Sequence, residues 1–78
     1  MGLQAIEQQL LNLLADEWEN TGPPGYLETK NLAEKLEIPL EKAKSVIHAL
    51  FVRGLVDTDE VDTYAAYLTP DGYERIRS

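Results

Sequence analysis

The stretch LAEKLEIPLEKAKSVIHALFVRGLV (residues 32–56) contains two helical patterns that meet at a short break. In the first pattern, apolar residues recur at the spacings of one helix face. They are Leu32, Ala33 and Leu36. Pro39 disfavours helical angles at the residue before it, so we expect this helix to span residues 29–37. Thr29 stands where a hydroxyl can cap the first free amides of that helix.

We expect a second helix over residues 39–53, because proline suits the first turn of a helix. Apolar residues then recur at three- and four-residue spacings, and they are Ala43, Val46, Ile47, Leu50 and Phe51. Gly54 follows, and glycine readily adopts the left-handed conformation that ends many helices. Leu55 and Val56 begin an extended segment. Two helices, a tight turn and a following strand predict a helix-turn-helix with a strand attached.

The rest of the chain predicts further elements around this pair. They are an amphipathic helix at 3–20, a loop at 21–25, a short strand at 26–28, a hairpin at 55–68 and a last short helix at 70–77. Thr69 and Pro70 suit the start of that last helix. The sequence thus predicts one small α+β domain with the element order α-β-α-α-β-β-α.

Composition narrows the classes of function. The chain has 78 residues, a net charge of −7, one histidine and no cysteine. The lack of cysteine excludes disulfides and thiolate metal sites, and it suits a reducing cytoplasm. No apolar stretch is long enough to span a bilayer, so we expect no membrane partner. No catalytic constellation, metal site or cofactor motif stands out, so we expect a protein that is not an enzyme.

Three separated motifs carry a resemblance to a known family. They are Leu32-Ala33-x-x-Leu36, Leu50-x-x-x-Gly54-Leu55-Val56 and Leu68-Thr69-Pro70-x-Gly72. Together they resemble the winged helix-turn-helix domains of bacterial and archaeal regulators, in particular the MarR-like group, over residues 26–77. The resemblance implies a winged-helix fold, binding to double-stranded DNA and regulation of transcription. The chain is too short for the helices with which MarR-like regulators dimerise, and its wing is acidic rather than basic.

In such domains the second helix of the pair lies in the major groove. Carried over by position, the resemblance implies that the candidate DNA-binding residues are Lys42, Lys44, Ser45 and His48, with Lys30 on the preceding helix. Lysines contact phosphate or guanine, and serine and histidine contact phosphate or bases. The alternative is a solvated helix face, with or without ion pairs from these lysines to Glu41 or Glu37.

The acidic charge supports a rival hypothesis, in which the chain binds a basic protein or acts as a DNA-mimicking inhibitor. Four candidate acids lie in the wing, and they are Asp57, Asp59, Glu60 and Asp62. Their spacing fails the rules for a calcium loop, because no glycine stands at the sixth position. On the first helix, Leu11, Leu14 and Trp18 form the outer edge of the apolar stripe. We expect the stripe to pack on the helix pair. The alternative is that this edge, with Leu11 and Trp18, also contacts a partner protein or a second copy in a homodimer.

Overall fold

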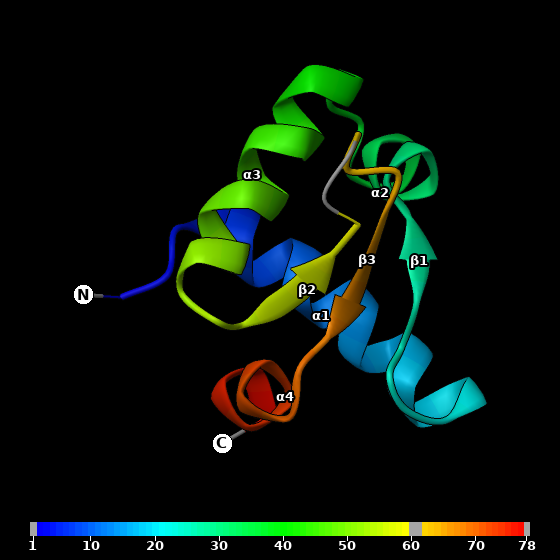
Figure 1. Cartoon of the computed structure of the whole chain (residues 1–78), viewed down its shortest axis with the longest axis vertical. Coiled ribbons are helices and arrows are strands. Elements are labelled where there is room, and N and C mark those ends of the chain that lie inside the picture. The colour runs from blue at the N-terminus through cyan, green and yellow to red at the C-terminus, as the bar shows by residue number, and fades with distance from the viewer. Residues whose placement is uncertain (1, 60–61, 78) are drawn as a thin grey trace.

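The computed structural model describes residues 2–59 and 62–77 (Figure 1). In these residues it is a small α+β structure with four helices and a three-stranded antiparallel sheet. The elements are α1 (Ala5–Thr21), β1 (Leu27–Glu28), α2 (Thr29–Leu36), α3 (Leu40–Val52), β2 (Val56–Thr58), β3 (Ala65–Leu68) and α4 (Pro70–Arg77). Their order is the predicted one, and each predicted boundary lies within two residues of the observed boundary.

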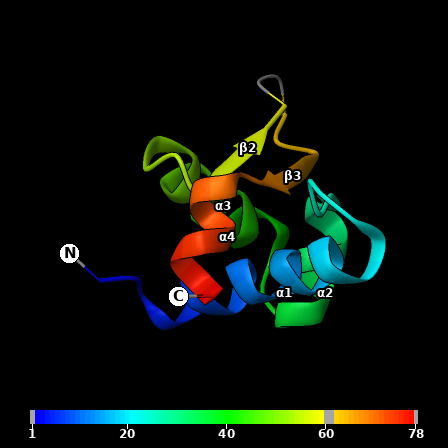
Figure 2. The same cartoon turned by 90° about the horizontal axis from the view of Figure 1, so that it is seen from below.

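The sheet has the strand order β1-β3-β2, so the last strand in sequence lies in its centre. Leu27 pairs with Ala66 on one side of β3, and Val56 pairs with Leu68 on the other. Figures 1 and 2 show α1 behind one face of the sheet, whereas no helix covers the opposite, outer face. None of the helices in the described ranges is long and apolar enough to cross a membrane.

The hydrophobic core lies between the inner face of the sheet and the first three helices. It is formed by Leu10, Leu11, Leu14, Ala15, Leu32, Val46, Ile47, Leu50, Leu55, Val56, Ala66 and Leu68. Leu36 is only half-buried at the edge of this cluster. Phe51 is 38% exposed, so its helical spacing did not place it in the core. The predicted stripe of α3 is otherwise confirmed, because Ala43, Val46, Ile47 and Leu50 are all buried.

The turn between α2 and α3 depends on a non-glycine residue in the left-handed conformation. Glu37 has φ 56° and ψ 46°. The Ile38 amide donates to the Ala33 carbonyl at 3.0 Å, which closes the last turn of α2. Pro39 has extended angles and stands just before α3, so it is not the first residue of that helix as predicted. The missing amide of Pro39 costs nothing there, because the first amides of a helix have no intrahelical partner.

The end of α3 has the same closing bond with a glycine in place of the glutamate. The Leu55 amide donates to the Leu50 carbonyl at 3.0 Å, and Gly54 has φ +77°. The prediction of a positive φ at Gly54 is confirmed. The chain leaves this cap directly into β2, which places the β2–β3 hairpin beside α3.

Helix α4 is held against the chain by close backbone contact. The Gly72 amide donates to the Thr69 hydroxyl at 2.9 Å, so the predicted cap of this helix is confirmed. A β-carbon at Gly72 would lie 1.9 Å from the Leu55 carbonyl oxygen. Only glycine therefore fits where α4 crosses the start of β2.

Thr29 does not act as the predicted cap of α2. The residue before it, Glu28, occupies the cap position, and no side chain caps the helix. The Thr29 side chain is buried, and its hydroxyl donates to the Thr63 carbonyl across the fold. The Thr29 amide donates to the Tyr64 carbonyl at 2.7 Å. Both bonds fix the start of α2 to the two residues that precede β3. A local sequence pattern could not reveal contacts between segments so far apart in the chain.

Candidate nucleic-acid interface

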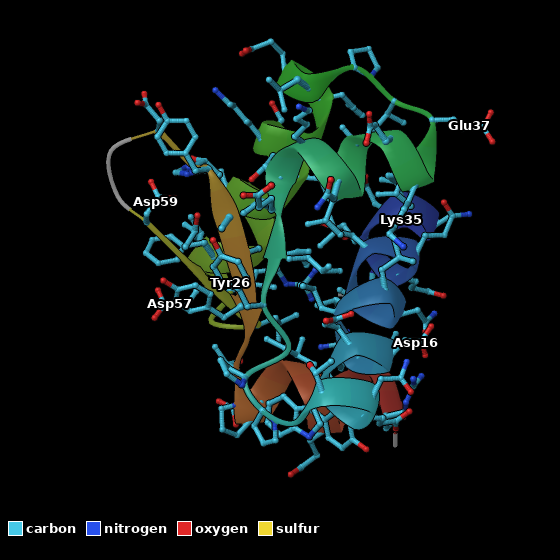
Figure 3. All side chains as sticks on the ribbon, turned by 90° about the vertical axis from the view of Figure 1, so that its right-hand side faces the viewer. Asp16, Tyr26, Lys35, Glu37, Asp57 and Asp59 are labelled. Atoms are coloured by element: carbon cyan, nitrogen blue, oxygen red, sulfur yellow. The ribbon has the colours of Figure 1, made fainter. Side chains whose placement is uncertain are left out.

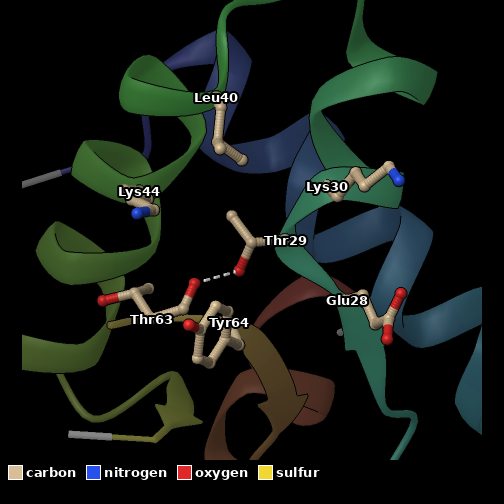
Figure 4. A pocket seen from close by; sticks show the side chains of 7 residues that line it. All are labelled: Glu28, Thr29, Lys30, Leu40, Lys44, Thr63 and Tyr64. Carbon is tan, nitrogen blue, oxygen red and sulfur yellow. Dashed lines mark hydrogen bonds between the residues drawn. The ribbon is translucent and has the colours of Figure 1, made fainter. Parts of the chain in front are cut away.

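Two neighbouring hollows lie between α3 and the β2–β3 hairpin. The first, the Lys30–Lys44 cavity, has a volume of about 300 Å³ and is lined by Glu28, Thr29, Lys30, Leu40, Lys44, Thr63 and Tyr64 (Figure 4). The second, the His48 cavity, has a volume of about 230 Å³ and is lined by His48, Phe51, Thr58, Asp59 and Thr63. Thr63 lines both cavities. The surface beside α3 is therefore concave along most of the helix.

The structure brings together most of the predicted DNA-binding residues. Lys30 on α2 and Lys44 on α3 line the same cavity from opposite sides, as Figure 4 shows. His48 is exposed one turn further along α3 and lines the second cavity. Lys42 and Ser45 are exposed on α3 but line neither cavity. All five residues are accessible at least in part, as contact with a nucleic acid would require.

The lysines of this surface are not neutralised by neighbouring acids. Arg53 forms an ion pair with Glu7, and Arg77 forms ion pairs with Asp16 and Glu19. No described carboxylate lies within ion-pair distance of Lys30, Lys42 or Lys44. Lys42 and Lys44 therefore make no ion pair with Glu41 or Glu37, and they lie on an exposed or half-buried part of the helix surface, as the alternative of a solvated helix face also expects. Their ammonium groups remain available for an anion such as a phosphate.

One acid of the hairpin has a structural role that the sequence did not reveal. The Asp59 carboxylate accepts hydrogen bonds from the amides of Asp62 at 3.2 Å, Tyr64 at 2.7 Å and Ala65 at 3.2 Å. These bonds, that of Asp62 above all, lower the pKa of Asp59 below its usual value. Asp59 thus shapes the connection between the strands, and it is not a freely exposed charge.

Of the other three hairpin acids, the structure describes two, Asp57 and Asp62. Asp57 is exposed on β2, where its carboxylate accepts the Thr58 amide at 2.9 Å. Asp62 is exposed. Glu60 lies outside the described residues, so the predicted cluster of four acids is only partly visible. Within the described ranges, no group of three or more histidine or acidic side chains is arranged to hold a metal ion.

The apolar stripe of the first helix packs into the core as expected, and the alternative, in which its outer edge contacts a partner, is wrong for Leu11. Leu11 and Leu14 are fully buried in the core, because α1 is covered on several sides by the sheet, α2, α3 and α4. Trp18 is half-buried and stacks on Tyr73 of α4, with the ring centroids 4.7 Å apart. Leu11 therefore offers no surface to a partner or to a second copy, and Trp18 is largely used within the chain.

Beside this stack lies a polar cluster, the α1–α4 corner, which the sequence analysis missed. Arg77 donates to Asn12 at 2.9 Å, to Asp16 at 2.8 Å and to Glu19 at 3.0 Å. The Tyr73 hydroxyl also donates to Glu19, at 2.8 Å. Bonds from Arg77 and then from Tyr73 lower the pKa of Glu19, and the same carboxylate raises the pKa of Tyr73. The four-residue spacing of Tyr73 and Arg77 predicts a shared face, but not its partner.

In chemical terms, the surface of α3 offers ammonium groups, a hydroxyl and an imidazole around a concave, partly apolar hollow. Such groups bind phosphate oxygens and base edges. Comparison of the chain with protein-family models gave no match, and comparison with curated protein sequences gave none either.

Proposed function

We propose that this chain is a winged-helix DNA-binding protein, similar to the MarR-like regulators, which regulates transcription by contacting double-stranded DNA through α3. The element order supports this assignment, because the helix pair α2 and α3 is followed directly by the β2–β3 hairpin, which belongs to the three-stranded sheet. In this arrangement α3 is the recognition helix and the β2–β3 hairpin is the wing. The concave surface between them then receives the DNA backbone.

The observation that carries the proposal is the set of lysines without ion pairs around α3. Lys30, Lys42 and Lys44 come from two helices, and Lys30 and Lys44 flank one cavity. Phosphate contacts by lysine release counterions from DNA, which supplies most of non-specific affinity. Three such contacts give modest affinity, in keeping with a protein whose net charge is −7.

The rival hypothesis, in which acids of the hairpin and first helix bind a basic protein, has less support from the geometry. Asp16 and Glu19 of α1 are already bound to Arg77. The carboxylate of Asp59 is occupied by three backbone amides. At these three acids a basic partner would have to compete with contacts that the carboxylates already make; Asp57 of the hairpin is not among them.

The test is a titration of the protein into a fluorescein-labelled duplex of mixed sequence, followed by anisotropy. Each phosphate contact lowers the logarithm of the binding constant by about 0.9 per tenfold rise in salt. Contacts by three lysines therefore predict binding about 40-fold weaker at roughly 200 mM than at roughly 50 mM salt. The double variant Lys42→Gln with Lys44→Gln should reduce the salt slope by about 1.8, and Lys42→Glu with Lys44→Glu should abolish binding.

Lys35→Gln is the matched control for these variants. Lys35 is an exposed lysine of α2 on the opposite side of the molecule from the hairpin (Figure 3). Its substitution removes the same charge and should change the affinity less than twofold, as expected for a residue that touches no phosphate. The proposal is wrong if Lys35→Gln weakens binding as much as the double variant does, or if no binding is measurable at the lower salt concentration.

A further inference from the structure

The outer face of the sheet carries a group of side chains of which only Glu28 also lines the Lys30–Lys44 cavity. Side chains alternate between the two faces of a strand. Ala66 and Leu68 of β3 lie in the core, so Ala65 and Tyr67 face outward. The register places Asp57 of β2 opposite Tyr67, and Glu28 of β1 opposite Ala65. The outer face thus carries Tyr26, Glu28, Asp57 and the half-buried Tyr67, together with Ala65, which is only 4% exposed.

Two tyrosines lie side by side in the middle of this face. The rings of Tyr26 and Tyr67 stack with their centroids 5.4 Å apart and their planes 29° from parallel. Tyr26 is 49% exposed although it is a large aromatic residue, and no helix covers the pair. Adjoining exposed apolar groups can mark an interaction site. Because an exposed ring face attracts cations, the pair can receive a planar cationic group.

The acids around this pair are not neutralised. Glu28 and Asp57 are both exposed, and no described cation lies within ion-pair distance of either. None of the five residues of the outer face is basic. Figure 3 shows Tyr26, Asp57 and Asp59 on the same side of the molecule. The face therefore combines aromatic rings with negative charge, which repels phosphates and attracts cations.

We propose that the outer face of the sheet binds an arginine-rich segment of a partner protein. One guanidinium group of this segment stacks on the exposed ring of Tyr26, and other guanidinium groups of the segment bind the carboxylates of Asp57 and Glu28, which lie on the two edge strands. Arginine fits this face better than lysine does, because its planar group stacks on aromatic rings and donates to two acceptors at once. Tyr26, Asp57 and Tyr67 line neither cavity beside α3, whereas Glu28 also lines the Lys30–Lys44 cavity. Changes at Tyr26, Asp57 and Tyr67 therefore distinguish a failure of this proposal from a failure of the DNA-binding proposal.

The charges within the chain favour a different protein over a second copy of this one. Arg77 is held by Asp16 and Glu19, and Arg53 lies 3.7 Å from Glu7. Arg75, the remaining arginine of the sequence, also has a partner within the chain. A second copy would thus have to break an internal contact in order to supply a guanidinium group.

The experiment measures binding of a fluorescein-labelled peptide of alternating arginine and glycine by anisotropy, with a lysine–glycine peptide of the same length as comparison. We expect the arginine peptide to bind more tightly. Glu28→Gln with Asp57→Asn should weaken its binding about fivefold, as expected for the loss of two exposed ion pairs. Tyr26→Leu keeps an apolar contact with Tyr67 but removes the ring, and it should weaken binding about threefold.

Glu34→Gln is the matched control, because Glu34 is an exposed glutamate of α2 outside this face. It should leave peptide affinity unchanged. In the unmodified protein, the backbone amide signals of Asp57, Ala65 and Tyr67 should shift on addition of the peptide. This measurement needs no variant, and so it tests the proposal even if Tyr26→Leu fails to fold.

Four results would overturn this assignment. Equal affinity for the lysine peptide would show simple charge attraction, and an equal loss in Glu34→Gln would show that the whole surface attracts the peptide. Amide shifts confined to α3 would place the peptide elsewhere. Sedimentation that shows a dimer separated by Glu28→Gln with Asp57→Asn would assign the face to a second copy.

Discussion

At the α1–α4 corner, Arg77 contacts Asn12, Asp16 and Glu19, whereas on the face of α3 the lysines make no ion pair among the described residues. The two regions thus use their charges in opposite ways. The net charge of −7 is a sum that hides this difference. Several acids are occupied by internal contacts, while Lys42 and Lys44 are available to a partner. Available charge, rather than net charge, determines which partner a surface attracts.

The largest expected effect on stability comes from a substitution that displaces α4 and, with it, the α1–α4 corner. Gly72→Ala puts a β-carbon 1.9 Å from the Leu55 carbonyl oxygen, so α4 must move away from β2. We expect the free energy of unfolding to fall by about 3 kcal/mol, the upper part of the range for overpacked sites. Urea denaturation measures this loss. A β-carbon at Gly2 has nothing within 4 Å, so Gly2→Ala should be neutral within about 0.5 kcal/mol.

A smaller effect sharpens the contrast by removing one cation from each region. Arg77→Gln removes the ion pairs of the corner and should lower the melting temperature by roughly 3 °C. Lys44→Gln should leave the melting temperature unchanged, because Lys44 has no described ionic partner to lose. For DNA affinity we expect the reverse, with a loss in Lys44→Gln and none in Arg77→Gln. If Arg77→Gln and Lys44→Gln have the same melting temperature, the ion pairs of the corner do not stabilise the folded state.

The smallest expected effect is a loss of folding stability at acidic pH. The pKa of Glu19 is lowered in the folded state by Arg77 and then Tyr73, and that of Asp59 by backbone amides, chiefly that of Asp62. A carboxylate whose pKa is lowered by folding stabilises the folded state at pH values above its pKa in the unfolded chain. This contribution is lost as the pH falls through the pKa of the folded state. The free energy of unfolding should therefore decrease as the pH falls below 4.5, the usual pKa of Glu19, and further below 3.8, the usual pKa of Asp59.

Unfolding followed at a series of pH values tests this dependence. Glu19→Gln should remove the share of the acid dependence that belongs to the corner, and Asp59→Asn the share that belongs to the hairpin. An unchanged pH profile in Glu19→Gln would show that the bonds to Arg77 and Tyr73 do not stabilise the folded state.

The fold was predictable because its signals are local. Helical periodicity, Pro39 and Gly54 gave the element order and the boundaries, since each acts through neighbouring residues. The spacing of apolar residues in α1 predicts a buried stripe, but spacing alone could not decide whether Leu11 at its outer edge also contacts a partner, because the elements that cover it are distant in sequence. The left-handed Glu37 also lacked a signal, because glycine is the residue that usually occupies such a position.

The candidate sites were predictable only in part. Lys42, Lys44, Ser45 and His48 follow from helix spacing once α3 is identified, and the structure leaves all four accessible in whole or in part. The bonds of Asp59 and Arg77 depend on how the chain folds back on itself. Arg77 meets Asp16 across 61 positions of sequence, and no local pattern specifies such a pair.

The open sheet also has consequences for the behaviour of the protein at high concentration. A three-stranded sheet that does not close into a barrel has two edges, here β1 and β2. Unpaired edges invite strands of other molecules and can start aggregation. Here β1 has two residues and β2 has three, and β2 carries the exposed charge of Asp57. Such short edges offer few backbone groups to a neighbouring strand, so the architecture itself discourages fibre formation.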